Sequence, residues 1–182
     1  INEKPVYKET EIPNPVAFYS WTKYWAEQLI EDKMKKGLKA IILRPRMLLT
    51  PVIHKKNVLY NMLVKYSKFH SNKNSFTVVD DLLLATKHLI EKNQIGIFHI
   101  TNKNTTTPYE IALLLKKYIN PDKQIELIKK EELDKKDLIR RVDAIIDTTK
   151  LENTGFKIKD INERLPEIIL KLKENIEKNK SS

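Results

Sequence analysis

Phe18-Tyr19-Ser20-Trp21-Thr22-Lys23 lies in a helical stretch that Gly37 ends, and Lys39-Ala40-Ile41-Ile42-Leu43-Arg44 follows it. The pattern predicts a helix from about Val16 to Lys36, because a basic last turn before a glycine is typical of a left-handed helix cap. The apolar run after the glycine predicts a short strand buried on both faces. A helix, a tight stop and a buried strand form the second half of a βαβ unit, so the sequence indicates an α/β fold.

The remainder of the chain predicts an alternation of short strands and helices. Thr107-Pro108-Tyr109-Glu110 combines a capping threonine, a proline at the first helical position and a glutamate three residues after the cap, which marks a helix start. Residues 1–15 are interrupted by prolines and are expected to form a loop. Three further helices are expected: residues 57–69, a helix that begins at Asp80 or Asp81 and ends at Lys92, and a helix after Asp160. The other expected strands are Ser75–Val79, Gly96–Ile100, Ile125–Ile128 and Ala144–Ile146.

Composition narrows the functional classes. The 182 residues include no cysteine, which excludes disulfides, a thiolate nucleophile and a sulfur-ligated metal. No run approaches the roughly 18 apolar residues of a membrane span, so we expect a cytoplasmic chain without a membrane partner. The net charge of +10 comes from lysines spread over most segments without a nucleic-acid-binding motif, and we expect no nucleic-acid partner. A positive field favours a small polyanion such as a nucleoside-diphosphate sugar.

Glycine is scarce, and this limits how a cofactor can bind. The chain has only Gly37, Gly96 and Gly155. A dinucleotide fingerprint needs three glycines within six residues, and a phosphate loop needs two glycines followed by a Lys-Ser/Thr pair. Neither arrangement occurs, so this chain lacks the usual means of holding the phosphates of a cofactor.

Tyr19 and Lys23 are the leading catalytic candidates. A spacing of i, i+4 on a helix places the phenol and the ammonium on one face, within reach of one small molecule. A nearby cation stabilises a phenolate, and such a pair can transfer a proton to or from a carbonyl or alcohol oxygen. The alternative from the residues alone is an exposed tyrosine beside a solvated lysine.

Two arginines after the strand are candidates for substrate binding. Arg44 and Arg46 could clamp a diphosphate, since a guanidinium pairs bidentately with phosphate oxygens. The alternative is that one of them pairs with a carboxylate such as Asp80 or Asp81 and so ties the domain together, and the sequence leaves both interpretations open. Asp80 and Asp81 are too few ligands for a metal site and suit a helix N-terminus better.

The remaining polar and aromatic candidates have simpler interpretations. His54, His70, His88 and His99 share no metal-ligand spacing, so no metal site is expected. His99 lies within an apolar strand and is expected to be a core or edge histidine with its hydrogen bonds satisfied. Arg140 and Arg141 could reach a substrate phosphate or lie in an exposed turn. Trp21 and Trp25 are expected to pack the first helix against the sheet.

Several segments, in this order, resemble the C-terminal half of the extended short-chain dehydrogenases/reductases, the NAD-dependent epimerase/dehydratase family. The first segment, Pro5–Lys23, is similar to the stretch that leads into the family's Tyr-x-x-x-Lys helix. The other segments are similar to the late strands and helices of the family. Within the family, the short span between Arg46 and Phe76 is most similar to the dTDP-4-dehydrorhamnose reductases and the bifunctional nucleotide-rhamnose epimerase/reductases. The segments are Pro5–Lys23, Ile42–Arg46, Phe76–Leu82, Gly96–Asn102 with Thr107–Ile111, and Arg140–Leu151.

The resemblance implies the C-terminal part of a Rossmann-like fold. Residues 1–50 would carry the Tyr-x-x-x-Lys helix and the next strand of the core, and 51–182 mainly the substrate-binding subdomain, with elements that return to the core. Tyr19 would protonate the sugar C4 oxygen as hydride arrives from NADP or NAD, and Lys23 would assist Tyr19 and bind the nicotinamide ribose. The glycine-rich loop and the catalytic Ser/Thr of the family would belong to a missing N-terminal half or a partner chain.

The implied activity is NAD(P)-dependent reduction of a nucleotide-4-keto-sugar, with or without epimerisation, of the kind used to make dTDP- or UDP-L-rhamnose. Two alternatives remain at this point. One is an epimerase or 4,6-dehydratase of the same family. The other is a catalytically silent relative that serves as a regulatory or interaction subunit. A homodimer is a further expectation, since helices such as 16–36 often pair across a dimer in this family.

Overall fold

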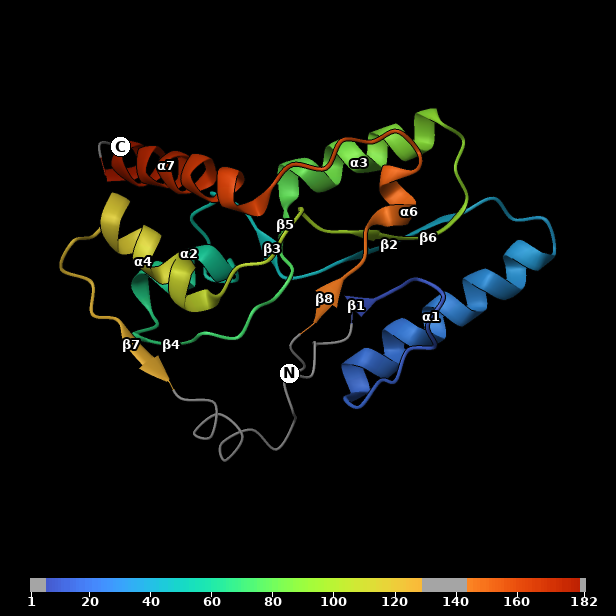
Figure 1. The fold of residues 1–182 in the computed structure, drawn as a ribbon, viewed down its shortest axis with the longest axis horizontal. Coiled ribbons are helices and arrows are strands. Elements are labelled where there is room, and N and C mark those ends of the chain that lie inside the picture. Colours follow the sequence, from blue (N-terminus) through green and yellow to red (C-terminus); the bar gives the residue numbers. More distant parts are fainter. Residues whose placement is uncertain (1–5, 129–143, 181–182) are drawn as a thin grey trace.

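The computed structural model describes residues 6–128 and 144–180, and it forms an α/β arrangement of short parallel strands and helices (Figure 1). Arg140 and Arg141 lie outside the described residues. In chain order the elements are β1 (Val6–Tyr7), α1 (Phe18–Lys35), β2 (Ile41–Pro45), β3 (Leu48–Leu49), α2 (Val58–Val64), β4 (Lys68–His70), β5 (Thr77–Val78), α3 (Val79–Glu91), β6 (Gly96–Ile100), α4 (Pro108–Tyr118), β7 (Glu126–Ile128), β8 (Ile145–Ile146), α6 (Thr149–Glu152) and α7 (Ile161–Lys180).

The strands pair in parallel, each with a partner far along the chain. β2 pairs with β6 from Ile41 opposite Gly96 to Pro45 opposite Ile100, and this is the longest pair. The shorter pairs are β1 with β8, β3 with β5 and β4 with β7. Parallel strands joined through helices confirm the α/β class predicted from the first helix and strand.

Two apolar cores support this arrangement. One is built on α2, α4 and α7, which gather at one end of the molecule in Figure 1, and it includes Leu59, Leu115 and Ile169. The other lies where α3 covers the β2–β6 pair, and it includes Leu89 and Phe98. The second core therefore fixes β2 and β6 from the α3 side, while α1 lies on their opposite side in Figure 1.

A buried ion pair joins α3 to α7. Arg164 Nε donates to Asp81 Oδ2 at 2.9 Å, and Asn102 Nδ2 donates to the same oxygen at 2.7 Å. Asp81 and Asp80 lie in the first turn of α3, as predicted, where they complement the helix dipole. The structure therefore gives Asp81 a different partner from the arginines after β2.

The local helix signals correspond to the structure. Thr107 Oγ1 accepts from Glu110 N at 3.0 Å and the Glu110 carboxylate accepts from Thr107 N at 2.9 Å, so the predicted capping box is confirmed. Gly37 follows α1 with a φ of 100°, which confirms the predicted left-handed position.

Other expectations were wrong or only partly right. The helix expected over 57–69 ends at Val64, and the chain then forms β4, whose Phe69 is buried. The strand expected over Ser75–Val79 has only two residues, because α3 begins at Val79, ahead of Asp80. The expected N-terminal loop contains β1. Pairing with distant strands, which local sequence does not reveal, explains β1 and β4.

The first helix and its strand are more exposed than predicted. α1 has no buried residue, and within β2 only Ile42 is buried. Trp21 and Trp25 are 38% and 52% exposed and stack on each other, with ring centroids 5.7 Å apart. The expectation that they pack α1 against the sheet is therefore wrong for this structure. Among the described residues, no helix is long and apolar enough to cross a membrane.

Candidate functional site

A groove of about 670 Å³ brings all four predicted site residues together. Tyr19 and Lys23 line it from α1, and Arg44 and Arg46 line it from the end of β2 and the residue after it. The loop from Lys8 to Ala17 contributes most of the remaining wall. The structure therefore converts four residues spread over 28 positions of sequence into one candidate site.

Tyr19 and Lys23 face the groove from adjacent turns of α1. Lys23 Nζ lies 5.3 Å from the centroid of the Tyr19 ring, over the ring face. The Tyr19 side chain is 71% exposed, so its hydroxyl is accessible to a molecule in the groove. The i, i+4 spacing thus produces the predicted juxtaposition of phenol and ammonium.

Arg44 is bound by a glutamate of α1 rather than by an aspartate of α3. Its Nε lies 3.0 and 3.1 Å from the two Glu27 carboxylate oxygens, and its Nη2 lies 2.5 Å from Oε2. Both side chains are less than one-fifth exposed. We call this bidentate ion pair between Glu27 and Arg44 the fork. Glu27 follows Lys23 by one helical turn, so the fork fixes the rotation of α1 that presents Tyr19 and Lys23 to the groove. Arg44 therefore pairs with a carboxylate, as the alternative expected, but that carboxylate is Glu27 rather than Asp80 or Asp81.

Arg46 is held by polar side chains at the end of the groove. Its Nη2 donates to Asn74 Oδ1 at 3.0 Å, and its backbone N–H donates to Thr77 Oγ1, also at 3.0 Å. Thr77 in turn donates to the Ile100 carbonyl at 2.7 Å. These bonds orient Arg46 from β5 and from the segment before it.

Glu9 does not line the groove itself but contacts His99, which does, and sequence reasoning missed this supporting residue. It comes from the loop that forms the groove wall, yet its side chain is only 8% exposed. Its Oε1 accepts from His99 N at 2.9 Å, and its Oε2 lies 3.8 Å from His99 Nδ1. The sequence shows Glu9 only as a charged residue between Tyr7 and the prolines. Its partner, His99, lies 90 positions further along the chain, so no local pattern indicates the contact.

His99 lies at the back of the groove as a buried strand residue, as expected. Burial lowers the pKa of His99 below its usual 6.5, the Glu9 carboxylate opposes that shift, and Arg44 adds to it. Its Nδ1 lies 3.3 Å from the Asp147 carbonyl. The described residues contain no group of three or more His, Cys, Asp or Glu side chains that could hold a metal ion.

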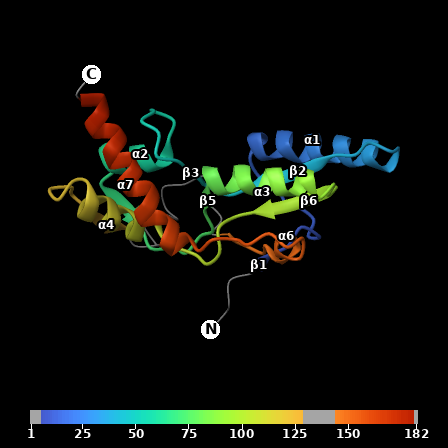
Figure 2. The ribbon, with the colours of Figure 1, turned by 90° about the horizontal axis from the view of Figure 1, so that it is seen from above.

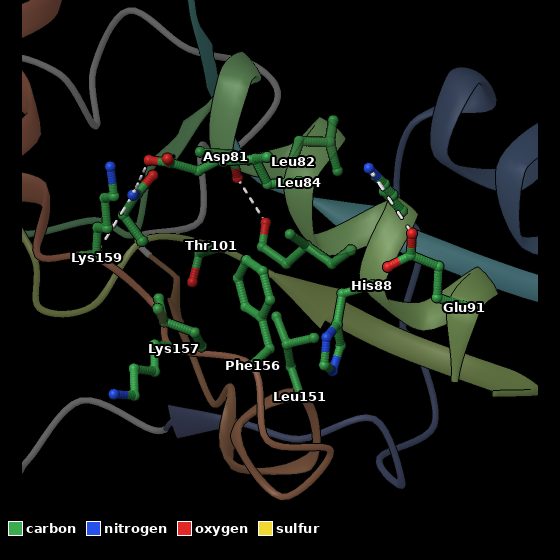
Figure 3. Close-up of a pocket in the computed structure, with 15 residues that line it drawn as sticks. Asp81, Leu82, Leu84, His88, Glu91, Thr101, Leu151, Phe156, Lys157 and Lys159 are labelled. Atoms are coloured by element: carbon green, nitrogen blue, oxygen red, sulfur yellow. Dashed lines mark hydrogen bonds and ion pairs between the residues drawn. The ribbon is translucent and has the colours of Figure 1, made fainter. Parts of the chain in front are cut away.

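A second cavity of about 320 Å³ lies between α3 and the segment 156–159 and contains none of the predicted site residues (Figure 3). Its wall is largely apolar, with Leu82, Leu151 and Phe156 around it. Of its polar groups, Asp81 is satisfied by Arg164 and Asn102, and His88 Nε2 lies 3.0 Å from Thr154 Oγ1. The four predicted site residues therefore lie in the groove and not in this cavity.

The family model described as "RmlD substrate binding domain" matches residues 2–174. The bifunctional dTDP-4-dehydrorhamnose 3,5-epimerase/dTDP-4-dehydrorhamnose reductase of Arabidopsis thaliana is 28% identical over 160 residues, which cover 87% of this chain and 52% of that protein. The chain thus spans about half the length of this relative.

Two solved structures show the same fold. The L780 UDP-rhamnose synthase from Acanthamoeba polyphaga mimivirus superposes with a TM-score of 0.76 at 23% identity, over 91% of this chain and 56% of that chain. The dTDP-4-dehydrorhamnose reductase from Bacillus anthracis in complex with NADP gives a TM-score of 0.72 at 21% identity, over 91% and 59% respectively. The described fold is therefore that of the C-terminal part of Rossmann-like extended short-chain dehydrogenases/reductases.

Proposed function

Since the chain belongs to the family described as the RmlD substrate binding domain, we propose that it is the substrate-side part of a nucleotide-sugar reductase. The reaction is the NAD(P)-dependent reduction of a nucleotide-4-keto-sugar, with or without epimerisation, in the formation of a dTDP- or UDP-linked rhamnose. One observation carries the proposal: Tyr19, Lys23, Arg44 and Arg46 line one groove. The 28% identity to a bifunctional 3,5-epimerase/reductase supports a reduction that is accompanied or not by epimerisation.

Tyr19 is the proposed proton donor. As hydride adds to C4 of the keto-sugar, the carbonyl π bond breaks and Tyr19 gives its phenolic proton to the C4 oxygen, which becomes a hydroxyl. Lys23 stabilises the phenolate that remains, because its ammonium is held one helical turn away. The phenolate then recovers a proton from water, which the 71% exposure of Tyr19 permits.

The substrate diphosphate is the proposed ligand of the arginine end of the groove. Arg46 is oriented by Asn74 and Thr77 and lies beside the groove. Arg44 adds positive potential there while its fork with Glu27 holds α1 in place. A guanidinium can pair bidentately with phosphate oxygens, so both arginines are proposed to contribute to diphosphate binding.

The residues present fit only one end of a nicotinamide cofactor. When bound, the cofactor supplies the hydride, and Tyr19 with Lys23 would meet its nicotinamide and ribose. The three glycines fit no phosphate loop, since Gly37 ends α1, Gly96 begins β6 and Gly155 follows α6. We therefore propose that a further segment, in the same or a partner chain, holds the phosphates of NADP or NAD.

Calorimetry on the isolated chain tests this division of roles. UDP, dTDP or the corresponding rhamnose nucleotide should bind the chain weakly, and Arg46→Ala should weaken that binding by tenfold or more. NADPH should give no measurable heat of binding. Micromolar NADPH affinity would show that the phosphate site is present after all, and nucleotide binding that Arg46→Ala leaves unchanged would place the substrate elsewhere.

A further inference from the structure

The cavity between α3 and the segment 156–159 is separate from the groove. No described residue lines both of them, and Figure 2 shows α6 and the segment after it on the side of β6 away from α1. The cavity volume of about 320 Å³ lies at the lower end of the range for ligand sites in proteins. An apolar cavity of about 150 Å³ can bind benzene, so this volume suits a molecule of roughly twelve non-hydrogen atoms.

Most of the cavity wall is apolar, and three parts of the chain contribute to it. α3 supplies Leu82 and Leu84, β6 supplies Ile100, and the segment after α6 supplies Phe156 and Ile158. Leu82, Phe156 and Ile158 also pack against the core beneath α3, which holds the wall in place. Such a wall binds the apolar part of a ligand by removing its surface from water.

Thr101 adds a polar group to this wall. It follows β6, lines the cavity and is only 3% exposed. Within residues 6–128 and 144–180, its buried Oγ1 has no hydrogen-bond partner, which costs stability in a folded protein. By contrast, the Asp81 carboxylate on the same wall is bonded to Arg164 and Asn102, so its charge is balanced. Thr101 is therefore where a ligand can gain a hydrogen bond that the described chain does not make.

Positive charge lies near Thr101. In the view of Figure 3, Thr101, Lys157 and Lys159 lie toward one side of the cavity, and His88 and Glu91 toward the other. Glu91 forms an exposed ion pair at 3.7 Å with a lysine of α3 that also lines the cavity, so these two charges balance each other. The lysines of the segment 156–159 therefore leave an excess of positive charge on the side of Thr101, which favours an anionic group there.

We propose that this cavity binds a small carboxylate with an apolar body, of the size of 3-phenylpropionate. The apolar body lies against Leu84, Phe156 and Ile158, and a carboxylate oxygen accepts from the Thr101 hydroxyl. The ammonium groups of the lysines in the segment 156–159 attract the same carboxylate. A nucleotide is too large and too polar for this wall. The inference concerns a second site and does not depend on which reaction the groove serves.

A methyl-resolved NMR titration of the chain with 3-phenylpropionate tests the ligand class. The methyl signals of Leu84, Thr101 and Ile158 should shift saturably with a Kd of about 1 mM or below. 3-Phenylpropanamide has nearly the same shape without the charge, and it should bind at least about fivefold more weakly. No saturable shift up to about 10 mM, shifts centred on the groove instead, or equal affinity for the amide would each overturn the proposal.

Three variants test where the ligand lies. Leu84→Trp fills the cavity from a position that is 51% exposed and should weaken binding of 3-phenylpropionate at least tenfold. Leu83→Trp is the matched control, since Leu83 is 62% exposed and does not line the cavity, and it should leave the affinity unchanged.

Thr101→Val removes the hydroxyl and keeps the shape of the side chain. It should weaken binding at least fivefold without lowering the melting temperature, because the hydroxyl has no partner to lose within the described residues. Binding that survives Leu84→Trp would place the ligand elsewhere. A lower melting temperature for Thr101→Val would show that the hydroxyl is already bonded, and either result would overturn the proposal.

Discussion

The fork between Glu27 and Arg44 should govern the stability of α1. Glu27→Ala leaves the Arg44 guanidinium in a position where its side chain is 19% exposed, without its carboxylate. Hydrogen bonds to charged groups contribute about 1.5–3 kcal/mol, and the partial exposure of this pair suggests about 2 kcal/mol. Because α1 has no buried residue, this loss should appear as local opening of the helix rather than as global unfolding.

Hydrogen exchange of peptides from α1 measures that opening. A loss of about 2 kcal/mol corresponds to roughly 30-fold faster exchange over Phe18–Lys35, while peptides from α4 and α7 should be unchanged. Asp32→Asn is the matched control, since it removes the exposed ion pair with Lys36 on the same helix and should change exchange by about twofold or less. If Glu27→Ala and Asp32→Asn behave alike, the fork does not hold α1 in place and the reasoning is refuted.

Three further predictions concern stability. Thr107→Ala removes the oxygen that accepts from Glu110 N and should lower the free energy of unfolding by about 1 kcal/mol in urea titrations; a change below about 0.3 kcal/mol would mean that the cap contributes little. Burial lowers the pKa of the His99 imidazole below 6.5 in the folded chain, so the unfolded chain binds a proton at this side chain more tightly. The free energy of unfolding should therefore fall as the pH decreases through and below 6.5. His99→Gln should flatten that decline between pH 7.5 and 5.5, and an unchanged slope would assign it to other groups. Lys123→Met removes the ammonium that donates to the carbonyls of Leu63 and Tyr66 at 2.9 and 2.6 Å, and should lower the melting temperature by several degrees, whereas the exposed Lys87→Met should not.

Local signals predicted the helices well because they are short-range. The capping box at Thr107, the left-handed glycine after α1 and the acidic first turn of α3 each involve residues within one turn of each other. The same local reasoning extended the helix after Asn57 through Phe69, where the chain forms β4. That strand depends on β7, which lies 58 positions further along the chain. Pairing over such a distance leaves no local pattern.

The four candidate residues could be named from the sequence, but their partners could not. Tyr19, Lys23, Arg44 and Arg46 line the groove, and their types and spacing indicated proton transfer at a carbonyl or alcohol oxygen and phosphate binding. Which carboxylate binds Arg44 depends on how α1 packs against β2, and the sequence alone did not single out Glu27, which lies 17 positions before Arg44. Similarly, Glu9 is distinguished only by its bond to a strand residue 90 positions away.

The exposure of Trp21 and Trp25 has a related cause. A tryptophan pair at helical spacing is normally buried, and the prediction assumed that neighbouring elements were present to bury it. The described residues supply only two strands of the central sheet beside α1. The prediction therefore failed because it assumed more of the sheet than this part of the chain provides.

Turnover of a nucleotide-4-keto-sugar by this chain joined to a cofactor-binding segment tests the central claim most directly. Tyr19→Phe removes only the phenolic proton, and it should lower kcat by about 10²–10⁴-fold while NADPH affinity stays within about twofold. Tyr66→Phe, at a tyrosine outside the groove, should retain wild-type turnover. Turnover by Tyr19→Phe within about threefold of wild type would contradict the account, because the groove would then not use Tyr19 as its acid.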